Sequence, residues 1–133
     1  MSGFLDTSIV VRYLTGDPPE LAEQAARVID GEDDLKITDV VLAETAYVLT
    51  SVYQAPRDIV VDYLIAFVQK ENISPFALGK GLVLHALLLC RPSGRISFAD
   101  AMVWAAARSA GSNIIYSLDE RFPADGLKVR RGP

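Results

Sequence analysis

The feature that most constrains this chain is a repeated alternation between short apolar runs and longer segments whose apolar residues recur at helical spacing. Two neighbouring parallel strands need a long crossover connection, which is usually a helix. The alternation therefore predicts an α/β domain with a central, mainly parallel sheet. Because a chain of 133 residues can bury a substantial core, we expect residues 1–133 to form a single domain.

The expected elements follow from the spacing of apolar residues and from the turn residues between them. Strands are expected at residues 2–6, 35–37, 113–117 and, at an edge, 127–129, while 73–76 is either irregular or a brief strand. Helices are expected at residues 7–14, 17–30, 39–53, 56–72, 78–90 and 97–110. Three of these helices are expected to be capped by Asp17, Asp39 and Ser97.

Composition limits the class of protein. Hydrophobic residues make up 50% of the chain and charged residues 23%, which is typical of a globular domain. We expect no signal peptide, because no basic region precedes an apolar one at the start of the chain. The apolar stretch 82–90 is too short to span a membrane. With Cys90 as the single cysteine, no internal disulfide can form, so we expect this thiol in the core and the protein in the cytoplasm.

The net charge of −4 argues against a nucleic-acid partner, since domains that bind nucleic acid are usually basic. Acids that hold divalent cations would reverse the sign of the charge locally. The net charge therefore makes a nucleic-acid partner less expected but does not exclude one.

Two aspartates follow expected strands. Asp6 comes where the first strand ends, in GFLDTSIV, and Asp119 comes just after the strand at 113–117. In open α/β sheets ligands bind beyond the carboxyl ends of the strands, so both side chains lie at the functional edge if both strands run parallel. Asp6 alone is better explained as a turn or cap residue, and it is the pair that indicates a site.

Two further acids lie on expected helices. Glu44 shares a helical stripe with Val40, Val41, Tyr47 and Val48, so it either reaches out at the edge of the stripe or is buried with a cation. An ordinary ion pair with an arginine would also explain it.

Asp100 stands three residues after Ser97 and is well explained as a favourable charge at a helix N-terminus. The helix that follows is almost entirely apolar, so its first turn can also point toward the sheet edge. His85, the single histidine, lies in an apolar stretch and is expected to be structural; no set of histidines and cysteines predicts zinc. Asp39 is better explained as a helix cap than as a metal ligand.

Four stretches together resemble the acidic motifs of the PIN-domain family. They are FLDTSIVVRYL at the start, AETAYVL in the third expected helix, SFADAMVWAAAR in the sixth and YSLDERF near the end. They occur in the family's order over nearly the whole chain. At this length, the chain is most similar to VapC-type toxins of type II toxin–antitoxin systems.

The resemblance implies a three-layer α/β/α fold and a metal-dependent endoribonuclease that cleaves the phosphodiester bonds of RNA such as tRNA or rRNA. By motif match, the catalytic and metal-binding residues would be Asp6, Glu44, Asp100 and Asp119, with Mg²⁺ or Mn²⁺ as the cofactor. The resemblance also implies a homodimer and a small VapB-like antitoxin that blocks the site. Hard divalent cations prefer oxygen ligands, so the chemistry of four carboxylates agrees with this assignment.

Three residues near Asp6 would support the site. Thr7 or Ser8 would do so through a hydroxyl or a backbone contact, and Arg12 lies within two helical turns, where it could pair with an acid or touch a phosphate. Basic residues at 91, 95, 128, 130 and 131 are either RNA phosphate contacts or ordinary surface charges.

Two alternatives remain open. A haloacid-dehalogenase-like phosphatase also places an aspartate after its first strand, but its chemistry needs a second acid two residues later, where this chain has Ser8. A PIN-like binding module, in which the acids are structural, would bind no divalent metal.

Overall fold

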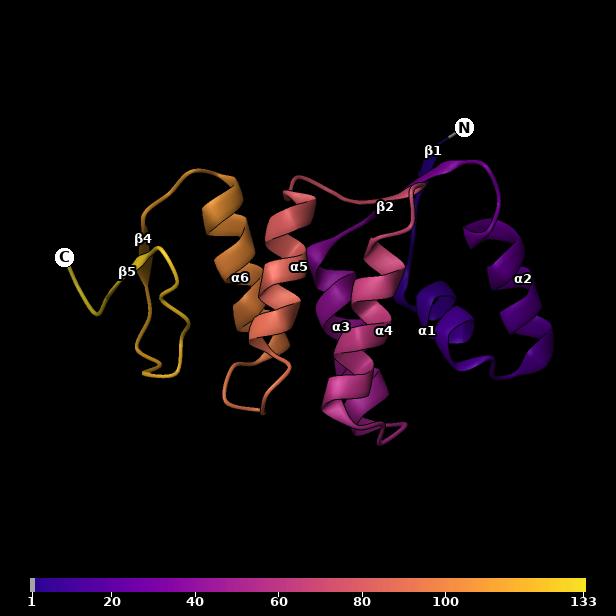
Figure 1. Cartoon of the computed structure of the whole chain (residues 1–133), viewed down its shortest axis with the longest axis horizontal. Helices are drawn as coiled ribbons and strands as arrows, with labels where there is room; N and C mark the ends of the chain where they lie inside the picture. Colours follow the sequence, from indigo (N-terminus) through magenta and orange to yellow (C-terminus); the bar gives the residue numbers. More distant parts are fainter. Residues whose placement is uncertain (1) are drawn as a thin grey trace.

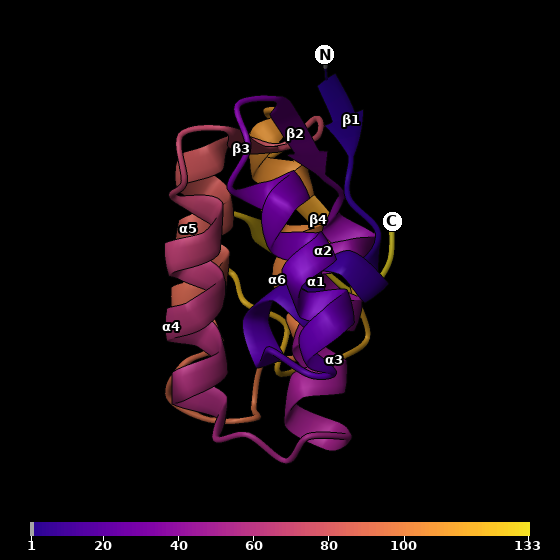
Figure 2. The same cartoon turned by 90° about the vertical axis from the view of Figure 1, so that its right-hand side faces the viewer.

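The computed structural model describes residues 2–133. Its strands are β1 (Ser2–Phe4), β2 (Asp34–Ile37), β3 (Ile73–Pro75), β4 (Ile114–Tyr116) and β5 (Lys128–Arg130). Its helices are α1 (Thr7–Thr15), α2 (Pro19–Ile29), α3 (Asp39–Ser51), α4 (Arg57–Val68), α5 (Lys80–Leu89) and α6 (Phe98–Ser109). Figure 1 shows the helices side by side along the molecule, and Figure 2 shows the same arrangement from its end.

The first three strands form one parallel sheet in the order β1-β2-β3. In its register Gly3 lies opposite Leu35, which lies opposite Ile73. Leu35, Ile37 and Ile73 are buried in the core with residues of helices α3 to α6. The α/β fold class with parallel strands, predicted from the sequence, is confirmed.

The last two strands form a second, separate parallel sheet, in which β4 pairs with β5. The expectation that the strand at 113–117 would join the central sheet is therefore not met. Figure 1 places β4 and β5 at one end of the long axis, beyond α6, and β1 toward the other.

Contacts with α6 explain this position of the C-terminal segment. The indole Nε1 of Trp104 donates a hydrogen bond to the backbone oxygen of Asp125 at 3.1 Å, and the Nη1 of Arg108 donates to the same oxygen at 2.7 Å. Leu127 is buried and Phe122 packs against the core. These contacts hold the turn before β5 on α6, so β4 stays beside it rather than beside β1.

Helix ends agree with the sequence at Ser97, whose Oγ accepts a hydrogen bond from the backbone N–H of Asp100 at 3.0 Å. The cap of α3 is Thr38 rather than Asp39: the Thr38 side chain accepts from the N–H of Val41, and Asp39 is the first helical residue. The two residue types are both good caps, and the expected boundary was one residue late.

The cap expected at Asp17 was also misplaced, since α2 begins at Pro19 with Pro18 as its N-cap. A residue that precedes proline disfavours helical backbone angles, so Pro18 stays extended, while proline at the first helical position is favourable.

The core prediction for Cys90 is confirmed, because its side chain is fully buried. Burial raises the pKa of the Cys90 thiol to about 11, so the group is neutral at physiological pH. Within residues 2–133, no helix combines the length and the hydropathy that a membrane-spanning helix needs.

Candidate metal centre

The first two predicted ligands, Asp6 and Glu44, line one open cleft of about 350 Å³. Asp6 is the N-cap of α1 and has an extended backbone, so its side chain leaves the chain at the junction between β1 and the helix. The hydroxyl of Ser8 donates a hydrogen bond to the Oδ2 of Asp6 at 3.0 Å. This contact orients the carboxylate and leaves its other oxygen available.

Glu44 reaches this cleft because α3 packs against α1. Of the two positions that the sequence allowed, the structure shows the exposed one: Glu44 is on the surface, and its helical neighbours Val40 and Tyr47 are 69% and 63% exposed. An exposed carboxylate flanked by exposed apolar side chains needs no buried cation to compensate it, and it can bind a ligand without first breaking an ion pair.

Two buried hydroxyls lie next to these acids in the sequence. In the part of the chain that the structure describes, the Oγ1 atoms of Thr7 and Thr45 are inaccessible and have no hydrogen-bond partner. Thr7 follows Asp6 and also lines the cleft, whereas Thr45 follows Glu44 and is fully buried. A buried hydroxyl without a partner is costly, so the Thr7 hydroxyl beside the cleft calls for a partner such as a water or an ion.

Arg12 supplies a positive charge to the same cleft. Its Nη1 donates a hydrogen bond to the hydroxyl of Tyr53 at 3.4 Å. Within residues 2–133 it forms no ion pair with Asp6 or Glu44, so the guanidinium is held by a neutral group and keeps its charge free for an anion.

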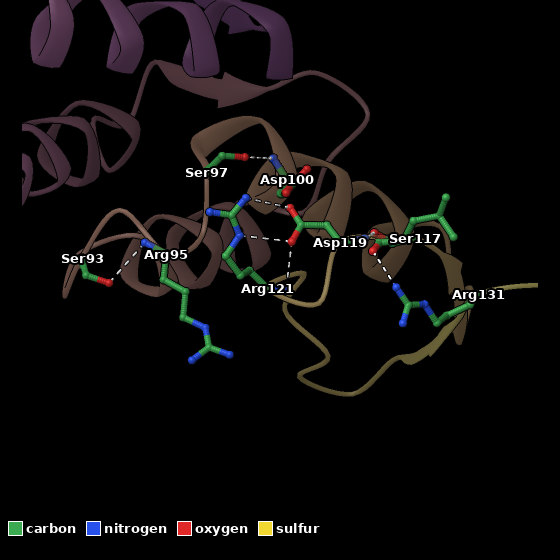
Figure 3. A network of polar contacts seen from close by, with 9 residues as sticks. Ser93, Arg95, Ser97, Asp100, Ser117, Asp119, Arg121 and Arg131 are labelled. Atoms are coloured by element: carbon green, nitrogen blue, oxygen red, sulfur yellow. Dashed lines mark hydrogen bonds and ion pairs between the residues drawn. The ribbon is translucent and has the colours of Figure 1, made fainter.

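The other two predicted ligands lie near each other at the C-terminal segment. Figure 3 shows Asp119 after β4 and Asp100 in the first turn of α6, with the guanidinium of Arg121 directed at the Asp119 carboxylate. Asp119 accepts hydrogen bonds from the backbone N–H of Arg121 at 2.8 Å, from its Nε at 3.2 Å and from its Nη2 at 3.4 Å. The hydrogen bonds to Asp119 raise the pKa of the Arg121 guanidinium, and the charge of Asp100 adds a smaller effect in the same direction.

The Arg121 backbone bond, followed by the bonds from its side chain, lowers the pKa of Asp119 below the ordinary 3.8. The carboxylate is therefore ionised at neutral pH, but a cation already satisfies it. Asp100 lies in the first turn of α6, as its sequence position suggested, and its backbone N–H donates to the Oγ of the cap residue Ser97.

The structure thus brings the four acids together as two pairs and not as one cluster. Within residues 2–133, no group of three or more acidic, histidine or cysteine side chains is close enough to hold one metal ion. The separation follows from the sheet topology: the side chains at the ends of β1 and β4 could meet only if the two strands were neighbours, and β4 pairs with β5 alone.

Arg121 is a residue of the site that sequence reasoning missed. The available signal was its position two residues after Asp119, in LDER, where a side chain can fold back onto the acid. Of the basic residues considered for RNA, Arg91 is engaged in a two-bond ion pair with Asp62 at 2.8 and 2.9 Å. The His85 ring, predicted to be structural, lies 4.7 Å from that of Trp104 and contacts Asp125 at 3.4 Å.

The cleft fits a hard divalent cation by the chemistry of its donors. The accessible side chains of Asp6, Ser8 and Glu44 offer only oxygen atoms, which suits Mg²⁺ or Mn²⁺ and not a softer metal. Mg²⁺ is commonly held by one or two carboxylates together with water and a phosphate oxygen. The pair Asp6 and Glu44 meets that requirement without Asp100 or Asp119.

Comparison with known proteins gives the family. The crystal structure of VapC20 from Mycobacterium tuberculosis, described as a toxin that cleaves the sarcin–ricin loop, matches with 23% sequence identity and a TM-score of 0.45, over 95% of this chain and 96% of that one. Comparison with curated proteins returned no significant match. The family model of the PIN domain matches residues 3–125, so the chain belongs to the PIN-domain family.

Proposed function

We propose that this protein is a metal-dependent endoribonuclease of the VapC type, which hydrolyses phosphodiester bonds in tRNA or rRNA. The observation that carries the proposal is the cleft in which Asp6 and Glu44 face solvent beside Arg12. In the part of the chain that the structure describes, no cation is paired with either carboxylate, so the two acids together with Arg12 form a site for a divalent cation and a phosphate. Membership in the PIN family favours this chemistry over the phosphatase alternative.

The residues of the cleft have distinct roles in this proposal. Asp6, oriented by Ser8, and Glu44 would hold Mg²⁺ or Mn²⁺, and Arg12 would contact a phosphate oxygen of the substrate. The bound cation supplies Lewis-acid chemistry, namely an activated water and neutralisation of charge on the phosphate.

In hydrolysis a water oxygen bonds to phosphorus, one phosphorus–oxygen ester bond breaks, and the water proton is passed to the leaving oxygen. No histidine lines the cleft, so a carboxylate must accept that proton in transit; of the two exposed carboxylates, Glu44 is proposed for this role because Ser8 already donates a hydrogen bond to Asp6. Asp100 and Asp119, the other two predicted ligands, lie outside this cleft in residues 2–133, and Asp119 would become available only when Arg121 releases it.

The partners follow from the same proposal. We infer a small VapB-like antitoxin, a homodimer, and a cytoplasmic location where RNA is available. Two hollows of about 390 and 340 Å³ on α1 and α4 share Leu14 and Tyr63, and the second is also lined by Tyr53, the hydrogen-bond partner of Arg12. An apolar segment of an antitoxin seated there would reach the edge of the cleft.

Cleavage of a mixed tRNA and rRNA pool tests the proposal. We expect the full-length protein to cut RNA with Mg²⁺ or Mn²⁺ and to stop with EDTA. We expect Asp6→Asn and Glu44→Gln each to reduce the rate about 100-fold or more, because each removes a charge that holds the cation. Asp62→Asn is the matched control, since it removes a carboxylate that pairs with Arg91 outside the cleft.

Cutting that persists in both cleft variants would contradict the proposal. A protein that neither cuts RNA nor binds Mn²⁺ in calorimetric titration would instead be the non-catalytic PIN-like module.

A further inference from the structure

The parallel sheet β1-β2-β3 has one buried face and one outer face. Along β2, Leu35 and Ile37 are buried, whereas Lys36 between them projects to the opposite side and is half-buried. In the register of the sheet Phe4 and Ser74 lie on either side of Lys36, so the three side chains form a row across the outer face. Figures 1 and 2 both show this sheet on one side of the helices. The outer face is therefore the part of the sheet that a ligand can reach.

Two exposed phenylalanines stand on the outer face, one on each side of β2. Phe76 directly follows β3 and donates its N–H to the oxygen of Ile37, so it continues the strand and alternates with the buried Pro75. The rings of Phe4 and Phe76 meet edge to face, with their centroids 5.1 Å apart and their planes at 62°. Phe4 is still 61% exposed and Phe76 51%. Exposed aromatic rings of this kind are surfaces on which an unpaired nucleobase can stack.

Lys36 adds a positive charge to the same row. Its Nζ donates a hydrogen bond to the Oγ of Ser74 at 2.9 Å. Within residues 2–133 Lys36 forms no ion pair, and Asp34, on the same side of β2, lies at the start of the strand. The neutral hydroxyl orients the ammonium group and leaves its charge for an anion. A lysine beside exposed aromatic rings suits a base together with its phosphate.

The outer face leads directly into the cleft of Asp6 and Glu44. Because Leu5 is buried, Phe4 and Asp6 lie on the same side of the extended chain, two residues apart. Two extended residues span about 7 Å, which is the length of about two stacked nucleotides. On the other side, α3 begins just after β2, and Val40, which is 69% exposed, lies one helical turn before Glu44. An RNA strand with a phosphate in the cleft would therefore extend over the outer face.

We propose that the outer face of β1-β2-β3 is a nucleotide-binding subsite, in which an unpaired base next to the scissile phosphate stacks on Phe4 and Phe76 while Lys36 contacts the phosphate of that nucleotide. The choice of RNA as the ligand rests on the proposed function. A wholly apolar face would favour a protein, but this row combines two aromatic rings with an ammonium group and a hydroxyl. Stacking reads no base edge, so the subsite selects unpaired over paired RNA rather than one sequence.

Binding of RNA without metal tests the subsite apart from catalysis. The probe is a fluorescein-labelled single-stranded oligoadenylate, followed by fluorescence anisotropy in EDTA with the full-length protein. We expect Phe4→Ala and Phe76→Ala, with unchanged circular dichroism, each to weaken binding about 5- to 100-fold. Phe4→Tyr keeps a stacking ring and should bind like the natural chain. Tyr63→Ala is the matched control, because it removes a 53% exposed ring from α4.

The salt dependence of the same binding tests Lys36. We expect Lys36→Gln to reduce the slope of log affinity against log salt by about 0.7, the value for one phosphate contact with a single strand. Arg27→Gln removes an exposed guanidinium that pairs with Glu23 on α2, and it should leave the slope unchanged. Equal slopes for Lys36→Gln and Arg27→Gln would contradict the phosphate contact.

Two results would overturn the subsite as a whole. Equal affinities of the natural chain, Phe4→Ala and Phe76→Ala for the oligoadenylate would show that no base stacks on these rings. A lower particle mass of Phe4→Ala in solution, with its RNA affinity unchanged, would assign the outer face to a protein neighbour.

Cleavage kinetics separate this subsite from the proposed function. With Mn²⁺ we expect Phe4→Ala to raise KM for single-stranded RNA and to leave kcat unchanged, because the ring holds the substrate without touching the reacting bond. Oligoadenylate binding that depends on both rings, with no cleavage by the natural chain, would support the subsite and remove the nuclease function. Cleavage with the same KM in Phe4→Ala, Phe76→Ala and the natural chain would support the nuclease and overturn the subsite.

Discussion

The cleft at the start of α1 and the loop after β4 both present an aspartate just beyond a parallel strand, but they treat its charge in opposite ways. Asp6 is bonded to a neutral hydroxyl, that of Ser8, and faces open solvent. Asp119 is wrapped by three hydrogen bonds from Arg121. The same residue type in the same topological position is thus ready for a cation in one region and already neutralised in the other.

This difference teaches that the position of an acid at a strand end does not by itself make a metal ligand. The local partner decides, because a metal ion must compete with whatever cation is already there. Arg121 would have to release Asp119 before the carboxylate could serve a metal, whereas the Ser8 bond leaves the charge of Asp6 unchanged.

The largest expected effect separates the two regions by activity. We expect Asp6→Asn to lower the rate of RNA cleavage more than 100-fold, and Asp119→Asn to lower it about 10- to 100-fold, because Asp119 acts indirectly or late. Initial rates at saturating Mn²⁺ measure both. If both substitutions lowered the cleavage rate by the same factor, the two acids would be equally important, and Asp119 would be a metal ligand like Asp6.

A smaller effect concerns the glycines that shape each region. Gly126 has a φ of +87°, and a Cβ there would collide with the guanidinium of Arg108. Gly16 ends α1 with a φ of +70° and has open space around it. We expect Gly126→Ala to lower the free energy of unfolding by about 1–3 kcal/mol, and Gly16→Ala by about 1 kcal/mol.

Urea unfolding followed by circular dichroism measures both glycine variants. If the two costs are the same, the contact between Arg108 and the C-terminal turn is too loose to fix the place of β4.

The smallest expected effect is the titration of Asp119. Because Arg121 lowers its pKa, the Asp119 carboxylate should protonate below pH 3.8, and the stabilisation from this contact is present above that pH and lost as the pH falls through the lowered value. We expect Arg121→Gln to move the midpoint, followed by carbon-13 NMR of the carboxyl group, upward toward 3.8. A midpoint that does not respond to this substitution would assign the shift to the backbone N–H alone.

The sequence was sufficient to predict most helices and strands and to bring two acids of the candidate site to attention. Periodicity located the helices because apolar residues such as those of α6 face a core in a regular pattern, and Ser97 marked a helix start by its side-chain chemistry. Asp6 and Glu44, two of the four predicted ligands, line one cleft because α1 and α3 follow directly from the strands β1 and β2, and their role as metal ligands stays a prediction.

The long-range arrangement of β4 was not accessible in the same way. Whether β4 pairs with β1 or lies beyond α6 depends on contacts between distant residues, such as Trp104 with Asp125, that leave no periodic signal. The contact of the Arg121 guanidinium with Asp119 could not be predicted from the sequence either, because a residue in a short loop can direct its side chain toward Asp119 or toward solvent. The cap at Thr38 differed from the expected Asp39 by one residue for a similar reason: two good caps stood side by side.

The position of Trp104 has a practical consequence. It is the sole tryptophan of the sequence, its ring is fully buried 4.7 Å from that of His85, and its indole N–H is tied to the turn that precedes β5. Release of that turn would expose the indole N–H to water, so the emission would shift to longer wavelength. The protein therefore carries a built-in optical reporter for the attachment of its own C-terminal segment, and stopped-flow fluorescence could follow that attachment without any label.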